Sequence, residues 1–455
     1  MSTNPAAPRP EITLWIAGLA ALAIYLDTTI LFVAFPEIGA TFDGESPSVL
    51  SWVLNGYTIV FAALLVPGGK AGDRFGHRQA FLAGSVVFTI ASMMCGWAQT
   101  VEWLIAARVG QGVGAALLIP ASLALVMAAF ANEQLPRVIA IWGAIGAASA
   151  ALGPSAGALL IESMGWRWAF YVNLPIGVAT LIAGMKFIAP SPPTGVRLPA
   201  LSGVVLVAAA AGLVSYAIVD SDRSGWLSGQ TLGLFVAGGV LLAGFVVHQQ
   251  RTVAPTLDLE LFSHPNFTWG NIGMFVYSTS FSAMFLGLIL FQVEVWDRSV
   301  LEAGLGVAPG AALAAVIASR LGRLAMRIGQ RPMVLAGAAL FTTGAVLRVV
   351  MLGESPSYWT SFAPSFFIAC LSIAMVFPQT TSAAAQSLPA DRRGVGGAVT
   401  QAVRQFGGSL GVAITLGLIG TGAGLELAGG FDRLWWFLVA GGAVTGLAAL
   451  PLQRR

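Results

Sequence analysis

The feature that most constrains this chain is a series of long apolar runs, each bounded by charged residues or prolines. Runs of about 20 residues match the helix length that crosses a bilayer, and a helix satisfies its own backbone hydrogen bonds in lipid. The expected helices span residues 13–36, 49–67, 80–98, 103–130, 137–161, 168–188, 198–219, 229–247, 268–294, 303–320, 332–352, 359–384, 399–421 and 432–450. Charged residues make up only 9% of the chain, against about 25% in soluble domains. The sequence therefore predicts an all-α polytopic membrane protein with fourteen transmembrane helices.

Lysine and arginine are unevenly distributed over the connecting segments. If the N-terminus is cytoplasmic, sixteen of the 23 basic residues fall in cytoplasmic segments, among them Arg9, Arg454 and Arg455. The outside receives only Arg167, Arg223, Arg298 and Arg433. Cytoplasmic loops of membrane proteins carry the excess of basic residues. We therefore expect a multi-pass protein of the cytoplasmic (inner) membrane of a bacterial cell, with both termini in the cytoplasm and no role in binding nucleic acid.

Two connecting segments repeat each other. The sequence GKAGDRFGHR begins at Gly69, after the second run, and GRLAMRIGQR begins at Gly322, after the tenth. Many secondary transporters consist of two similar halves with the substrate site between them near the midplane. We therefore expect one six-helix bundle in residues 1–190, a second in residues 266–455, and two inserted helices with flanking linkers in residues 191–265.

Four motifs, in order along the chain, resemble a known family. They are LDTTILFVAFP from Leu26, GKAGDRFGHR from Gly69, RVGQGVGAA from Arg108 and GAASAALGPSAG from Gly146. They look like the signature motifs of the fourteen-helix drug:proton antiporters of the major facilitator superfamily, which are multidrug efflux transporters. The resemblance implies the major facilitator fold. One departure is Phe32, where this family usually has asparagine.

Asp27 lies deep in the first apolar run, about 21 Å from its start at 1.5 Å per residue. A carboxylate at that depth costs several kcal/mol unless it is paired, hydrated or protonated. This cost suits a group that binds and releases the coupling proton. The alternative is a structural carboxylate that caps Thr28 or a neighbouring helix.

Arg108 and Glu294 are the other candidates for proton coupling. In the resembled family an arginine at the position of Arg108 is implicated in coupling, and one that approaches and leaves Asp27 would switch its affinity for the proton. The alternative is an arginine that extends to the membrane surface. Glu294 ends the ninth run, where it either helps to attract substrate and relay protons or lies at the interface.

A second group of candidates concerns conformational switching. In the segment from Gly69, we expect Asp73 to stabilise a neighbouring helix N-terminus and so hold the two halves together in one state. Arg74 and Arg78 are expected to pair with acidic residues of the cytoplasmic side; the alternative is that these charges only set the topology. The complete set is Gly69, Asp73, Arg74, Gly76 and Arg78, together with Gly153, Pro154 and Gly157 of the fifth run, whose small residues and proline favour tight packing and a kink.

Polar and aromatic residues within the runs are candidates for contact with substrate. They are Gln111, Trp52, Tyr57, Phe281, Gln292 and Arg404. An apolar cavity lined by aromatic side chains with a few polar groups is the usual form of a small-molecule site. The alternative for each is packing inside the bundle or contact with lipid.

Several classes of function find no support in the sequence. It contains no P-loop, no metal-ligand cluster, no nucleophile with a histidine partner and no filter-like repeat of polar residues. We expect neither an enzyme nor a channel, and no cofactor or metal. The energy source is then an ion gradient, expected to be protons, with sodium as an alternative.

The expected function is proton-coupled antiport in which a monomer exports lipophilic small molecules by alternating access. With so few acids in the membrane, a neutral or monocationic substrate is expected. The alternative within the same fold is a dedicated exporter of one native metabolite, such as an antibiotic or a siderophore.

Overall fold

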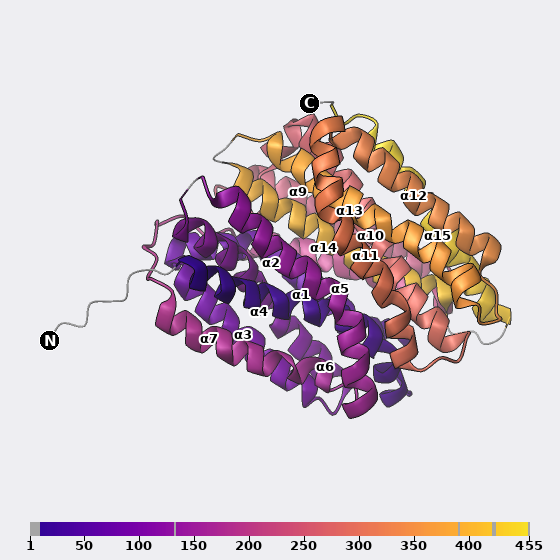
Figure 1. The fold of residues 1–455 in the computed structure, drawn as a ribbon. Helices are drawn as coiled ribbons and strands as arrows, with labels where there is room; N and C mark the ends of the chain where they lie inside the picture. The colour runs from indigo at the N-terminus through magenta and orange to yellow at the C-terminus, as the bar shows by residue number, and fades with distance from the viewer. Residues whose placement is uncertain (1–9, 132, 390–391, 421–424, 454–455) are drawn as a thin grey trace.

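The protein is a bundle of helices, and the part of the chain that the structure describes contains no strand (Figure 1). The computed structural model describes residues 10–131, 133–389, 392–420 and 425–453. Arg9, Arg454 and Arg455, which we used to place the termini, lie outside the described residues. The first seven helices are α1 (Pro10–Thr41), α2 (Pro47–Phe75), α3 (His77–Gly96), α4 (Val101–Ala129), α5 (Leu135–Met164), α6 (Trp168–Tyr171) and α7 (Asn173–Phe187).

The remaining helices follow in the order that the apolar runs predict. They are α8 (Leu201–Ser224), α9 (Gly229–Arg251), the short 3₁₀ helix η1 (Leu259–Ser263), α10 (Pro265–Glu294), α11 (Val300–Ile328), α12 (Gln330–Met351), the π-turn η2 (Tyr358–Phe362), α13 (Ala363–Gln386), α14 (Arg393–Ile419) and α15 (Leu425–Ala449). Among the described residues, 13 helical spans are long and apolar enough to cross a membrane by length and composition. The last expected span, 432–450, lies almost entirely within α15.

Two apolar runs differ from the expected helices. The sixth forms two helices, α6 and α7, with a turn at Val172 between them. The tenth was expected to end at residue 320 but continues as α11 to Ile328. Its last turns carry Arg323 and Arg327, whose side chains are exposed. A long cation of this kind keeps its charge in water while its helix continues, so the charges do not mark the helix end.

The two repeated segments are not loops, as the sequence suggested, but helix ends joined at a single glycine. Helix α2 continues through Gly69 and Asp73 to Phe75, and α3 begins at His77. Gly76 between them has φ 98°, and Gly329 between α11 and α12 has φ 90°. Such a conformation suits glycine, which has no Cβ. The repeat in sequence is therefore a repeat in backbone geometry.

The face of the bundle at which α1 ends and α2 begins is called here the opposite face, and the one at which α1 begins is called the N-terminal face. Four helices that begin at the opposite face have an N-cap whose hydroxyl accepts a backbone N–H. The caps are Ser46 of α2, Thr100 of α4, Ser228 of α9 and Ser299 of α11, the last in a capping box with Glu302. Each such cap is worth about 1 kcal/mol.

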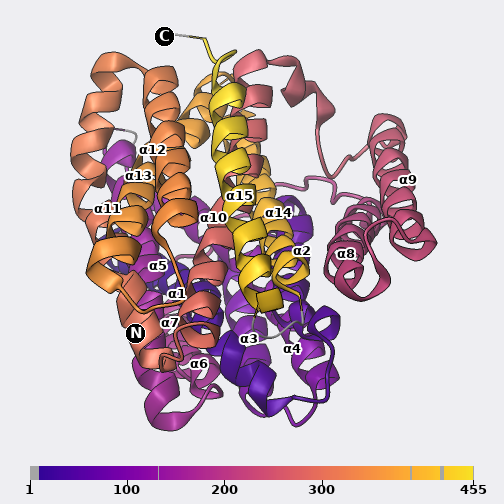
Figure 2. The same cartoon turned by 90° about the vertical axis from the view of Figure 1, so that its right-hand side faces the viewer.

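Helices α8 and α9 form a pair beside the two larger groups of helices (Figure 2). Helix α8 packs against α2 and α14, which belong to different groups. Helix α9 presents an apolar exterior, with Leu232, Val236, Val240 and Leu242 exposed. A stripe of this kind suits contact with lipid tails.

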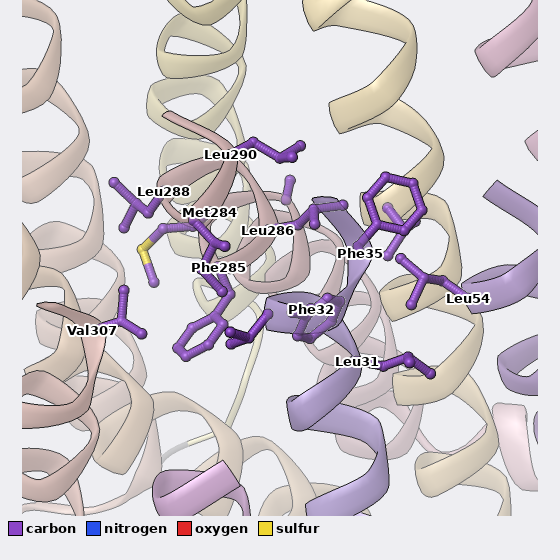
Figure 3. Packing of buried hydrophobic residues seen from close by; sticks show 14 of the residues in the cluster. Leu31, Phe32, Phe35, Leu54, Met284, Phe285, Leu286, Leu288, Leu290 and Val307 are labelled. Carbon is purple, nitrogen blue, oxygen red and sulfur yellow. The ribbon is translucent and has the colours of Figure 1, made fainter. Parts of the chain in front are cut away.

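The groups α1–α7 and α10–α15, referred to below as the first and second halves, meet through a shared apolar core. Its first-half members all lie toward the opposite face, and those of α1 run from Leu26 to Ile38. Phe32 of α1 lies 6.0 Å from Phe285 of α10 between ring centroids, and both rings point into the same packed layer (Figure 3). The halves are therefore sealed together by apolar contacts at the opposite face.

This seal predicts the effect of enlarging Gly304, at the contact of α11 with α5. A Cβ at Gly304 would lie 2.7 Å from the carbonyl oxygen of Pro154. Gly304→Leu should force the two helices apart, at a cost of about 1–3 kcal/mol for overpacking. In a Phe285→Cys background, labelling by a membrane-impermeant maleimide from the opposite face should rise.

Gly322→Leu is the matched control for this prediction, because a Cβ at Gly322 of the same helix meets nothing within 4 Å. Background labelling by the maleimide is expected to be low, because the native cysteines, Cys95 and Cys370, are both buried. Equal labelling rates in the Gly304→Leu and Gly322→Leu proteins would contradict the proposed seal.

Candidate functional site

A buried ion pair joins α1 to α4. The Arg108 Nη1 atom lies 2.7 Å from Asp27 Oδ2, and the two residues are only 1% and 2% exposed. Two sequence alternatives are wrong in this structure: a surface position for Arg108 and a cap of Thr28 by Asp27. Arg108 does not extend to the surface, and the Thr28 hydroxyl donates to the Ile24 carbonyl rather than to Asp27.

Two further side chains, those of Gln111 and Asn173, complete the hydrogen bonds of the Asp27 carboxylate, and Ser92 accepts from both of them. Gln111 Nε2 and Asn173 Nδ2 donate to Asp27 Oδ1 at 2.8 and 2.9 Å. The same two amides donate to Ser92 Oγ at 3.1 and 3.0 Å, and Ser92 Oγ donates to the Phe170 carbonyl. Buried polar groups are stable only when they are paired in this way. Asp27, Arg108, Gln111, Asn173 and Ser92 are called here the Asp27 cluster.

The sequence did not predict Asn173 and Ser92 as residues of this site. Asn173 is the first residue of α7, and Ser92 is a small polar residue in α3. Each stands in an apolar run without a charged neighbour, and small polar residues occur in many transmembrane helices for packing alone. The available signal, an asparagine within an apolar run, is too common to single out one position.

Arg108 is held on every side of its guanidinium. Its Nε donates to the Val53 carbonyl at 3.0 Å, and its Nη1 also donates to Gln111 Oε1 at 2.5 Å. The Tyr57 ring lies beneath it, 4.1 Å from Cζ to the ring centroid. Cation–π contacts of this kind stabilise a desolvated arginine. Tyr57 and Gln111, predicted to bind substrate, are instead fully buried around the ion pair.

The Asp27 cluster has no net charge while the carboxylate is ionised. Oδ1 accepts two amide N–H groups and Oδ2 accepts the guanidinium. A proton that binds Oδ2 must therefore replace the contact with Arg108. The cluster can thus alternate between an ion pair and a protonated carboxyl with a displaced arginine, provided that water reaches it.

Glu294 lies apart from the Asp27 cluster. It is the last residue of α10 and its side chain is exposed at the opposite face. Among the described residues it makes no hydrogen bond or ion pair with the cluster. Neighbouring Gln292 is fully buried and accepts from Arg298 Nη1 at 3.1 Å. The structure therefore brings neither Glu294 nor Gln292 to Asp27.

The remaining members of the predicted substrate set lie in different surroundings. Phe281 of α10 packs against Phe377 of α13 at 5.4 Å between centroids, and the Arg404 guanidinium of α14 lies 4.5 Å from the Phe377 centroid. Trp52 instead packs against α8, where a Cβ at Gly212 would lie 3.0 Å from its ring. Phe281 and Arg404 are the two candidates that share one environment.

The charged candidates for switching make contacts within the first half and its linker. Asp73 Oδ1 lies 3.3 Å from His77 Nε2, and its backbone carbonyl accepts from Thr194. Arg78 donates to the Met185 carbonyl at 2.7 Å, and Arg74 lies over the ring of Phe75. The expected pairing of Arg74 and Arg78 with acids is wrong in this structure. The contacts of Asp73 do not join the two halves either.

The small residues among these candidates sit where helices approach closely. A Cβ at Gly153 or Gly157 of α5 would collide with Thr29 or Ile30 of α1, and one at Gly69 would lie 3.6 Å from Pro120. Pro154 presents its carbonyl to Gly304 of α11, as described above. Helix α5 is thus held between α1 and α11, across the boundary of the halves.

The chain is similar to known proteins in sequence and in structure. A model of the Major Facilitator Superfamily matches residues 17–412. The tetracenomycin C resistance and export protein of Streptomyces glaucescens is 31% identical over 89% of this chain and 75% of its own. The multidrug resistance protein Stp of Mycobacterium tuberculosis is 32% identical over 89% and 74%. The crystal structure of a D-xylose-proton symporter has a TM-score of 0.69 at 14% identity and covers 97% of each chain, which shows a shared fold.

The geometry of the ion pair predicts a specific pattern of stability. Asp27→Asn and Arg108→Gln each leave one buried partner uncompensated, which costs about 3–5 kcal/mol. The double variant removes both charges and should lose clearly less than the sum of the single losses. Thermal unfolding of the detergent-solubilised protein measures this double-mutant cycle. Strictly additive losses would mean that the two side chains do not interact.

Proposed function

Because the chain belongs to the major facilitator superfamily, whose members are transporters and not enzymes, we propose that it is a proton-coupled antiporter that exports lipophilic small molecules. It would work by alternating access, with a site between the two halves that opens to one face at a time. The single observation that supports this proposal best is the sealed Asp27–Arg108 pair, an expensive group that packing alone does not require. The names of the relatives, which refer to resistance and export, support the direction of transport.

The N-terminal face is proposed to be cytoplasmic. Among the described residues, the connections at this face carry Arg74, Arg78, Arg137 and Arg251, as the distribution of basic residues in membrane proteins favours. The apolar seal at the opposite face then closes the outer side. The described conformation would be the one that accepts substrate from the cytoplasm.

The proposed cycle couples the Asp27 cluster to the seal. When the halves separate at the outer face, water reaches Asp27, a proton binds Oδ2 and the Arg108 guanidinium loses that contact. When the outer face closes again, Arg108 returns to the carboxylate and the proton leaves toward the cytoplasm. One proton moves inward for each substrate molecule that moves outward, so no cofactor is required. The protein would act as a monomer, since each chain holds a complete site.

A second candidate is a dedicated exporter of one native metabolite. The observation that favours it is a relative named for resistance to and export of a single compound, tetracenomycin C. A relative named for multidrug resistance favours the broader specificity. Measuring transport over a panel of compounds separates the two, because a dedicated exporter should move one chemical class at least tenfold faster than the others.

The test of coupling uses the full chain in proteoliposomes with an imposed proton gradient. The parent should move substrate against its concentration gradient. Asp27→Asn should lose uphill transport, because a side-chain amide does not take up and release a proton near neutral pH. Asp43→Asn is the matched control, since Asp43 is exposed in the loop after α1. It should pump at the parental rate.

Two results would contradict this coupling. Uphill transport by Asp27→Asn at the parental rate would remove the role of the carboxylate. Uphill transport driven by a sodium gradient alone, at equal pH on both sides, would replace protons by sodium as the coupling ion.

A further inference from the structure

One face of α14 carries hydrogen-bond donors that have no acceptor. Arg404 and Gln401 are three residues apart, so they lie on the same face of the helix. Gln401 Nε2 is buried without a hydrogen-bond partner. The Arg404 side chain is partly exposed, and among the described residues it forms no ion pair. Its position is about 16 Å along α14 from Arg393, in the middle part of the helix.

Arg404 lies between the two halves, among aromatic side chains. Its guanidinium lies over the ring of Phe377 of the second half, and Tyr25 of α1, in the first half, lies in its neighbourhood. Phe377 in turn packs against Phe281. The surroundings of the cation are thus apolar or phenolic.

Three acids of the helices, Asp27, Asp220 and Glu294, are each engaged elsewhere or distant from Arg404. Asp27 is paired with Arg108 and sealed from solvent. Asp220 of α8 accepts from Ser224 and Gln230 within the α8–α9 pair. Glu294 is exposed at the end of α10. None of these carboxylates compensates the Arg404 charge.

A second cation in the same half adds to the positive potential. Arg348 of α12 is fully buried, and its Nη2 contacts Met284 Sδ and the Ser365 carbonyl, both at 3.3 Å. Its Nε and Nη1 have no hydrogen-bond partner. Long-range charge interactions are weakly screened in a low-dielectric interior. The second half therefore holds two arginines, Arg348 and Arg404, that no carboxylate among the described residues pairs with.

We propose that the exported substrate carries an acidic group, a carboxylate or similar oxyanion, that binds to Arg404 and Gln401 while its apolar body packs on Phe281 and Phe377. A guanidinium binds a carboxylate through two parallel hydrogen bonds, which suits a partly desolvated arginine that lacks a partner in the protein. This inference rests on the proposed export function and specifies its substrate class. It replaces the expectation of a neutral or monocationic substrate, because a cation would be repelled by Arg404.

The sign of the substrate charge has a consequence for energetics. Exchange of one external proton for one internal monocation moves no net charge. Exchange of one proton for one internal monoanion moves the equivalent of two positive charges inward. A membrane potential that is negative inside therefore drives export of the anion, by about fiftyfold in the equilibrium gradient per 100 mV for each charge.

Binding to the purified full chain is measured first, by equilibrium dialysis. The probes share one aromatic body: anthracene-9-carboxylate, its neutral N-methylamide and the cation 9-(aminomethyl)anthracene. The parent should bind the carboxylate at least tenfold more tightly than the other two. Arg404→Gln should lose that preference without weakening the amide, and Arg404→Lys should keep part of it. Arg251→Gln, an exposed arginine at the end of α9, is the control for loss of a positive charge and should match the parent.

Three outcomes overturn the inference. They are a parent that prefers the amide or the cation, an Arg404→Gln protein that binds acid and amide with equally reduced affinity, and an Arg251→Gln protein that loses the preference as well. The second outcome would mean a structural role for Arg404. Retention of a folded state is checked by the thermal unfolding transition, and Arg404→Lys provides the variant that keeps the charge if Arg404→Gln does not fold.

Transport of the carboxylate separates this inference from the proposed function. In proteoliposomes with a proton gradient, a potassium–valinomycin potential, negative on the side from which substrate is exported, should accelerate anion export and raise the final gradient. Accumulation that is indifferent to the potential overturns the inference although export stands. Arg404-dependent binding of the carboxylate, without any accumulation in a proton gradient, overturns the export function although the anion site stands.

Discussion

The rest of the structure depends on the free-energy cost of burying the ion pair between Asp27 and Arg108. Two opposite charges at 2.7 Å are tolerated inside the bundle because the amides of Gln111 and Asn173 complete the hydrogen bonds of the carboxylate. Their attraction is strong only while water is excluded. The closed opposite face supplies that exclusion, through the packing of α1 against α10. Opening this face would hydrate the pair and weaken it, so the chemistry of the site and the conformation of the bundle are linked by physical necessity.

Close backbone approach at small residues accompanies the seal that the larger side chains of α1 and α10 form. Small residues allow helices to approach closely without interlocked side chains. At α5 the glycines face α1, and the Pro154 carbonyl faces Gly304 of α11. At α2 and α14 the halves are joined by a hydrogen bond between Asn55 and Ser409. Contacts of this size can be broken at modest cost, which a two-state transporter requires.

Much of the architecture can be predicted from the sequence, because a bilayer allows few kinds of membrane-spanning structure. Apolar runs of the right length predict the helices, although α2 and α11 continue past the charged residues that follow their runs. Asp27 and Arg108 are recoverable for the same reason, since an ionisable residue in such a run demands a partner. Their contact is not encoded locally. It depends on the packing of α1, α3, α4 and α7, which also brings Ser92 and Asn173 to the carboxylate.

Aromatic residues were the hardest to assign, for a physical reason. Trp52 and Phe281 both stand in apolar runs, yet Trp52 packs against α8 and Phe281 packs against Phe377 of α13. Their chemistry is the same, so only the rotation of each helix about its axis separates the two outcomes. The prediction of loops for the two repeated segments was wrong for a different reason. Their polar residues are typical of loops, but such residues can remain helical where the helix end reaches water.

The two halves share a fold but differ in how they treat charge. In the first half the arginine of α4 is neutralised by a carboxylate and shielded from solvent. Helix α13 is the counterpart of α4 in the repeat, and within it the described residues carry no charge. Among the described residues, Arg404 on α14 and Arg348 on α12 of the second half form no ion pair, and the counterpart of α14, α5, has glycine and alanine at its centre. The two halves thus carry charge differently: the neutral, sealed pair of the first half is the group proposed to exchange a proton, and Arg404 on α14 is the group proposed to bind the substrate.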